Sequence, residues 1–231
     1  MSRGDSEPSE SLLHWPGLRQ IAYALGLSTA LTAWFVFVYG GADWFTQQHT
    51  YRIRVHFEFE REMPLVPPLV LGYLSLNPLL WLSPFVLRSR RELRAFAFAL
   101  GGATAIAGLG FLLCPAEEVF VPVENRDRGA WQAWFLLTKQ IALRHNYLPS
   151  LHVAFATVCT LAYLDRAHGS ARFMLIAWWS VITASTLLIH QHYLLDVVTG
   201  ALLGWLMFQF VFRRLQAETH PNRSVDRAPP A

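Results

Sequence analysis

The chain alternates between long stretches that carry no charge, or almost none, and shorter polar segments. Six stretches approach the length that a helix needs to cross a bilayer, about 20 residues. They are Ile21–Gly40, Pro64–Leu87, Ala95–Cys114, Pro149–Leu164, Phe173–Ile189 and Tyr193–Phe212. Lipid offers no hydrogen-bond partner to the main chain, so helices are the expected structure for such stretches. The pattern predicts an all-α integral membrane protein, a bundle of six transmembrane helices.

Composition supports this interpretation. Of the 231 residues, 53% are hydrophobic and 15% are charged, whereas a soluble domain has about 25% charged residues. We expect one membrane domain at 19–214, with polar tails at 1–18 and 215–231. The net charge is only +3 and the basic residues form no stripe, so a nucleic-acid partner is not expected.

The distribution of basic residues predicts the orientation of the bundle. With the N-terminus inside, twelve of the 19 Lys and Arg residues fall on the cytoplasmic side and seven on the outer side. The compact group at 88–94 weighs most, because positive charge near helix ends favours the cytoplasm. We therefore expect both termini inside and two long loops, 41–63 and 115–148, outside.

The second outer loop contains one apolar segment, Ala130–Leu143, that is too short to cross the membrane. Its residues Trp131, Trp134 and Phe135 are typical of a helix that lies at the headgroup level. A loop helix packed on the bundle would show the same pattern. Both alternatives place the segment beside the outer ends of the helices.

Ionisable side chains within apolar stretches indicate function, because their burial in lipid is costly. His152 lies near the outer start of the fourth stretch, and Asp196 near the outer start of the sixth. His192 precedes Asp196 by four residues, which places the two on one face of a helix start. A carboxylate that holds one imidazole nitrogen leaves the other available for proton transfer or attack.

Two alternatives involve other chemistry. His190, His192 and Asp196 together could ligate a metal ion, although this leaves His152 without a role. The two cysteines, Cys114 and Cys159, both lie in apolar stretches and are expected to be small buried side chains rather than a disulfide. The sequence therefore favours an acid–base and nucleophile set with no metal and no cofactor.

These residues resemble the motifs of the type 2 phosphatidic acid phosphatase (PAP2) superfamily. The second family motif, Pro-Ser-x-His, is matched at Pro149–His152. The third is Ser-Arg, five residues, His, three residues and Asp. Its spacing is reproduced by Ser185, His192 and Asp196, with Thr186 in place of Arg. The resemblance spans residues 95–212 and places the catalytic motifs within 115–200.

The chain also departs from the family pattern. The first motif, Lys, six residues and Arg-Pro, is not found after the third stretch, and Leu151 replaces the commoner Gly of the second motif. These features are similar to the branch that contains inositol-phosphorylceramide synthases and related bacterial proteins. Phosphoryl transfer requires cationic side chains or N–H donors in contact with the negative phosphate oxygens. Arg126, Arg128 and Arg144 lie in the loop that could supply the positive charge.

The resemblance implies a lipid phosphatase that hydrolyses a phosphate monoester or pyrophosphate through a phosphohistidine. His192 would be the nucleophile, Asp196 would hold its ring and His152 would be the general acid and base. Ser150, Ser185 and the main-chain amide near Leu151 would contact phosphate oxygens, helped by the start of the fourth helix. A phosphotransferase acting on a lipid or alcohol acceptor is the second possibility, and a non-catalytic protein that binds a lipid phosphate is the third. The expected location is a bacterial cell membrane, with the site on the outer face.

Overall fold

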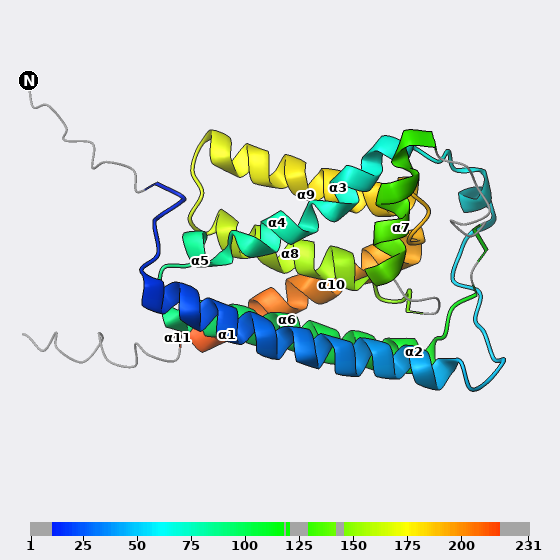
Figure 1. The fold of residues 1–231 in the computed structure, drawn as a ribbon, viewed down its shortest axis with the longest axis horizontal. Helices are drawn as coiled ribbons and strands as arrows, with labels where there is room; N and C mark the ends of the chain where they lie inside the picture. The colour runs from blue at the N-terminus through cyan, green and yellow to red at the C-terminus, as the bar shows by residue number, and fades with distance from the viewer. Residues whose placement is uncertain (1–10, 118, 121–128, 142–145, 218–231) are drawn as a thin grey trace, which may run out of the picture.

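The computed structural model describes residues 11–117, 119–120, 129–141 and 146–217. These residues form helices and connecting segments, and one isolated bridge between Ile53 and Ala116 is their only β pairing. In Figure 1 the long helices run side by side along one axis, and α7 lies across one end of the bundle. The predicted all-α fold is therefore confirmed for the part of the chain that is described.

Long helices correspond to five of the six predicted stretches. Two of them run through a π-helical turn (η1 or η6) without interruption. The bounds are α1 (Leu18–Phe35), η1 (Val36–Gly40) and α2 (Gly41–Thr46); α6 (Arg90–Leu113); α8 (Leu151–Leu164); α9 (Ser170–Leu188); and α10 (Leu194–Met207), η6 (Phe208–Phe212) and α11 (Arg213–Ala217).

The remaining stretch, predicted as one helix at Pro64–Leu87, is divided into short helices. They are η3 (Pro67–Leu69), α3 (Val70–Leu74), α4 (Leu76–Trp81) and α5 (Ser83–Val86). Pro78 lacks the N–H that would bond the Leu74 carbonyl, and the Asn77 side-chain amide donates to that carbonyl instead, at 3.1 Å. Proline at the start of α5 accounts for the second division in the same way.

Four helices are long and apolar enough to cross a membrane: Leu18–Thr46, Arg90–Leu113, Ser170–Leu188 and Leu194–Ala217. They support the prediction of a membrane protein. The predicted number of six is not confirmed, because α3–α5 is divided and α8 has only 14 residues.

Small residues bring α8 and α10 together. A Cβ at Gly200 would lie 2.4 Å from the Ser150 carbonyl oxygen, and a Cβ at Gly204 would lie 2.5 Å from that of Ala154. Only glycine permits such an approach. This contact fixes the start of α8 against the first turns of α10, where the predicted site residues lie.

The loop segment predicted at Ala130–Leu143 forms α7 (Gln132–Ile141). Its Phe135 is fully buried in a cluster with Val70, Tyr73 and Ile189. Of the two alternatives left open by the sequence, the structure shows the helix packed on the bundle. Trp134 remains 45% exposed on its other face.

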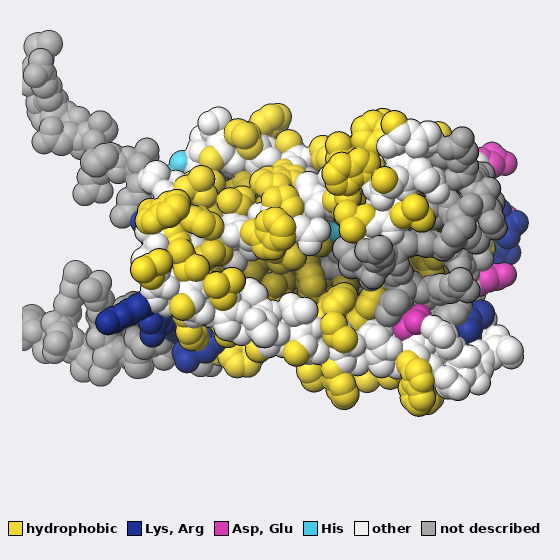
Figure 2. Space-filling model, viewed as in Figure 1, with side chains coloured by type: hydrophobic (Ala, Val, Ile, Leu, Met, Phe, Trp, Pro, Cys, Tyr) yellow, Lys and Arg dark blue, Asp and Glu magenta, His cyan; other side chains and the backbone are white. Residues whose placement is uncertain are grey.

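The opposite end of the bundle carries the start of α1 and α11 (Figure 1). Arg166 pairs there with Glu92, whose side chain also accepts a hydrogen bond from the main-chain amide of Ser89 at the start of α6. Basic side chains gather at this end in Figure 2. Cys114 and Cys159 are both free, as expected; Cys159 is buried, whereas Cys114 is only partly buried.

Candidate active site

The two matched motifs meet at one end of the bundle, although about 40 residues separate them in the chain. The main-chain amide of Ser150, at the start of α8, donates a 3.0 Å hydrogen bond to the Asp196 carbonyl oxygen in the first turn of α10. This direct contact brings His152 and His192 to the same end of the bundle. The sequence predicts this, because successive helices run in opposite directions.

His192 and Asp196 form the centre of the site. The His192 Nδ1 lies 3.5 Å from Asp196 Oδ2, and the Asp196 side chain is fully buried. Oδ2 also accepts a hydrogen bond of 2.9 Å from the main-chain amide of Tyr193. The 3.5 Å separation exceeds a normal hydrogen bond, and catalytic hydrogen bonds are often long before substrate binds. The geometry directs Nδ1 toward the carboxylate and leaves Nε2 as the nitrogen free for chemistry.

His152 is held by a residue that the sequence motifs do not include. Its Nε2 lies 2.8 Å from the Tyr73 carbonyl oxygen, and its ring stacks on the Tyr73 ring with the centroids 3.8 Å apart. Because a carbonyl only accepts hydrogen bonds, Nε2 carries the proton in this contact. Nδ1 is then the nitrogen that can gain or lose a proton.

The turn between α9 and α10 is closed by main-chain hydrogen bonds to one residue. The Thr186 carbonyl accepts from the amides of Gln191 and His192, at 3.0 and 3.1 Å. The Thr186 hydroxyl donates to the Thr183 carbonyl at 2.8 Å. Thr186 stands where the family motif has Arg, so in this chain the position supports the turn and supplies no charge.

His190 is oriented by contacts of its own. Its backbone has a φ of 61°, its Nε2 lies 3.0 Å from the Met63 carbonyl oxygen, and its ring stacks on Phe120 with the centroids 4.2 Å apart. Within the described residues, no group of three His, Cys, Asp or Glu side chains is placed to hold a metal ion. The set of His190, His192 and Asp196 is therefore not assembled as three ligands here.

The predicted phosphate-binding residues include two buried serines, one leucine on the cavity wall and three arginines outside the described residues. Ser150 is buried, and its Oγ accepts a hydrogen bond from the Val153 amide at the start of α8. Ser185 is also buried, and its hydroxyl donates to the Ile182 carbonyl of its own helix at 2.6 Å. Leu151 is beside His152 on the cavity wall. The three predicted arginines, Arg126, Arg128 and Arg144, lie outside the described residues.

Glu60, in the segment between α2 and η3, is a buried residue near the site that the sequence motifs did not reveal. It lies in the short helix η2 (Glu58–Glu62) and is 1% exposed. Its Oε1 accepts from the Leu194 amide at 2.6 Å, and its Oε2 accepts from the Phe57 amide at 2.7 Å. A buried carboxylate thus connects this loop to the first residue of α10.

Aromatic rings surround the turn that carries His192. The Tyr147 ring meets the His192 ring edge to face, with the centroids 6.0 Å apart. The Tyr193 hydroxyl accepts a hydrogen bond from the Val119 amide, and the His56 ring lies 5.4 Å from the Tyr193 ring. Burial and the neighbouring guanidinium groups of Arg54 and Arg61 lower the pKa of His56. His56 is therefore neutral at pH 7 and packs as an aromatic side chain.

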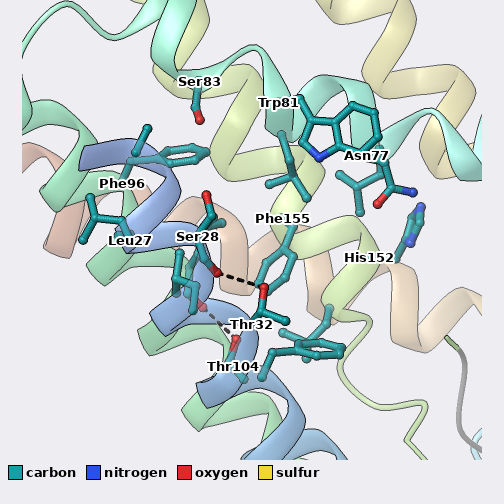
Figure 3. Close-up of a pocket in the computed structure, with 18 of the residues that line it drawn as sticks. Leu27, Ser28, Thr32, Asn77, Trp81, Ser83, Phe96, Thr104, His152 and Phe155 are labelled. Atoms are coloured by element: carbon teal, nitrogen blue, oxygen red, sulfur yellow. Dashed lines mark hydrogen bonds between the residues drawn. The ribbon is translucent and has the colours of Figure 1, made fainter. Parts of the chain in front are cut away.

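Both histidines open onto one cavity of about 560 Å³. Its wall is mostly apolar and is formed by α1, η1, α3–α5, α6 and the start of α8. In Figure 3, His152 and Asn77 lie at one end of the labelled side chains, and Leu27 and Phe96 lie at the other. Asn146 also lines the cavity, and its side-chain amide donates to the Tyr39 carbonyl at 2.8 Å.

Comparison with known proteins supports the resemblance of the motifs. A family model described as the PAP2 superfamily matches residues 51–210. An uncharacterized protein of Methanocaldococcus jannaschii is 32% identical over 63 residues, which are 27% of this chain and 26% of that protein. The chain thus spans about a quarter of the length of this curated relative. No solved structure matches the chain significantly.

Proposed function

The chain belongs to the PAP2 superfamily, and on that premise we propose that it hydrolyses a phosphate monoester or pyrophosphate of a lipid. One observation carries the proposal. His152 and His192 line a single cavity with a mostly apolar wall, and Asp196 is fully buried beside His192. Such a site can bind a phosphate at one end and an aliphatic group along the rest.

In the first step, His192 Nε2 attacks phosphorus, and the bond between phosphorus and the lipid oxygen breaks. The electron pair of that bond stays with the lipid oxygen, which takes a proton from His152 Nδ1. Asp196 stabilises the positive charge that develops on the His192 ring. A phosphate monoester gives the free lipid alcohol in this step, and a pyrophosphate gives a lipid phosphate. In both cases His192 becomes a phosphohistidine.

In the second step, His152 Nδ1 takes a proton from water, and the water oxygen attacks the phosphohistidine. The bond between phosphorus and His192 Nε2 breaks, and inorganic phosphate leaves. An alcohol in place of water would give phosphate transfer instead, which is the alternative function. The family supports both reaction types, and the acceptor decides between them.

The phosphate oxygens require positive charge or N–H donors in both steps. Leu151 and His152, the first two residues of α8, line this end of the cavity, and a helix start favours an anion. Ser150 and Leu151 contribute to that helix start. Ser185 contributes through its packing, because its hydroxyl bonds its own helix. Arg126, Arg128 and Arg144 are proposed to supply the charge.

The proposed arrangement in the membrane has six crossings, with α3–α5 and α8 as the two shorter ones. Both termini would lie in the cytoplasm, and the histidines would face the outer side of a bacterial cell membrane. The ratio of twelve to seven basic residues supports this orientation.

The experiment that tests the function measures phosphate release by the purified protein from a panel of lipid phosphates and pyrophosphates, with and without an alcohol acceptor. His192→Ala should abolish release, and His168→Ala, in the exposed turn before α9, should leave it unchanged. Vanadate should inhibit, and EDTA should not. Transfer to the acceptor would favour the phosphotransferase. Vanadate binding without turnover on any lipid would favour the non-catalytic alternative, and loss of activity in EDTA with recovery in zinc would favour a metal site.

A further inference from the structure

The cavity extends far beyond the histidines. Along α1 and η1 its lining residues run from Ile21 to Tyr39. At a rise of 1.5 Å per residue these positions are about 27 Å apart, close to the thickness of the hydrocarbon core, about 30 Å. Tyr39 lies at the end where Asn146 and His152 meet the cavity, and Ile21 lies at the opposite end with Phe85 and Leu93.

The cavity is open to the side between α1 and the divided helix α3–α5. In α1, which the structure describes completely, Ala24 is the only buried residue. Leu25 and Trp81 line the cavity from its two sides, yet they are 63% and 72% exposed. Figure 2 shows a hollow on this face with hydrophobic side chains along it. In a membrane this opening would face lipid.

Three polar side chains on the cavity wall donate to main-chain carbonyls three or four residues before them. The Thr32 hydroxyl donates to the Ser28 carbonyl, and the Thr104 hydroxyl donates to the Leu100 carbonyl, as the dashed lines in Figure 3 show. The Asn77 amide donates to the Leu74 carbonyl. The donors of these three side chains are therefore already used, and most of the other lining residues away from the histidines are apolar.

We infer that this cavity binds a single long aliphatic chain of the lipid substrate, with the phosphate at His152 and His192 and the chain directed along α1. A water molecule occupies about 30 Å³ and a methylene group is of similar size, so the cavity holds roughly 20 carbon atoms, which matches one long chain. The inference rests on the proposed function and adds the class of lipid to it. The chain enters from the bilayer between α1 and α4.

The test places a large side chain in the cavity at a distance from the histidines. Ser28→Trp lies eleven residues from Tyr39, about 16 Å along the helix. Thr29→Trp is the matched control, because Thr29 is equally exposed on α1 but does not line the cavity. Ser28→Trp should lower kcat/KM on n-eicosyl phosphate about tenfold or more, the order expected from overfilling a packed site. The loss for Ser28→Trp should be much smaller on n-butyl phosphate, whose short chain does not reach Ser28, and Thr29→Trp should hydrolyse both substrates like the original protein.

Two further measurements complete the test. Thr32→Trp, one turn nearer the histidines, should shift the loss to shorter alkyl phosphates. Dioleoyl phosphatidate, with two chains, should be a much poorer substrate than n-eicosyl phosphate. Equal activity on the one-chain and two-chain substrates, or equal effects of Ser28→Trp and Thr29→Trp on the eicosyl substrate, would overturn the inference.

A binding measurement separates this inference from the proposed function. Binding of n-eicosyl phosphate to the His192→Ala protein should be weakened by Ser28→Trp and not by Thr29→Trp. That result with no turnover in the original protein would support the cavity assignment and contradict the catalytic proposal. Turnover that requires His192, together with binding that Ser28→Trp does not weaken, would support the catalytic proposal and contradict the cavity assignment.

Discussion

Glu60 accepts a hydrogen bond of 2.6 Å from the main-chain amide of Leu194, the first residue of α10. Two residues later, Asp196 lies 3.5 Å from the His192 ring. A carboxylate at the start of a helix satisfies an unpaired amide and favours the helix dipole. The segment between α2 and η3 therefore helps to position the start of α10, which carries the carboxylate beside the proposed nucleophile.

Glu60→Ala should lower kcat more than it raises KM, because it loosens the α10 start and removes the acceptor of the Phe57 and Leu194 amides. A hydrogen bond to a charged group contributes about 1.5–3 kcal/mol, so the melting temperature should also fall. Glu60→Gln should recover part of the activity, since its amide oxygen still accepts one bond.

Glu58→Gln is the control in the same short helix. The Glu58 side chain is 66% exposed and pairs with Arg54 and Arg61, and exposed pairs contribute about 0–1 kcal/mol. The Glu58→Gln variant should therefore keep the activity and the melting temperature of the original protein. A fully active Glu60→Ala variant with an unchanged melting temperature would show that Glu60 does not position the site.

His152→Ala should slow the release of an alkyl alcohol about 10²–10⁴-fold, the usual contribution of a general acid. An aryl phosphate such as p-nitrophenyl phosphate has a good leaving group and needs less protonation. Formation of the phosphoenzyme from it should therefore be affected much less, as pre-steady-state release of nitrophenol would show. Equal losses on both substrates would contradict the acid role of His152.

Sequence and structure agree where the determining interactions are local. Uncharged stretches predict the long helices, and the spacing of His192 and Asp196 predicts their proximity. The division of α3–α5 depends on Pro78, which removes one main-chain donor from an otherwise regular apolar stretch. The contacts of Glu60 with Leu194 and of Tyr73 with His152 join residues 134 and 79 positions apart. No periodic pattern encodes such pairs, so the sequence could not predict them.

The three arginines of the segment at 115–148 provide a further prediction. At least one of Arg126, Arg128 and Arg144 should lose about 10²-fold or more in turnover when changed to Ala, as for loss of one charge-stabilising donor. Arg144 is the first choice, because it precedes the Pro-Ser-Leu-His segment by a few residues. Arg54→Ala, which removes an exposed pair with Glu58, is the control. Near-normal turnover in all three single variants would mean that other groups hold the phosphate.

Orientation can be tested with single cysteines after Cys114 and Cys159, both free, are replaced. Thr50 and Ser170 are exposed at opposite ends of the bundle. In intact cells, Thr50→Cys should react with an impermeant thiol reagent and Ser170→Cys should not. The opposite labelling would place the histidines on the cytoplasmic side.

The most direct test of the central claim is to trap the intermediate. The protein is incubated briefly with a lipid phosphate labelled with ³²P, quenched in alkali and mapped by peptide analysis. The account predicts label on His192 that is stable to alkali, is released by acid, and is absent from His192→Ala. It also predicts stronger labelling in His152→Ala with an aryl phosphate, because hydrolysis of the intermediate is then slowed. Turnover by the original protein with no label on His192, or by His192→Ala at a normal rate, would contradict the phosphohistidine mechanism.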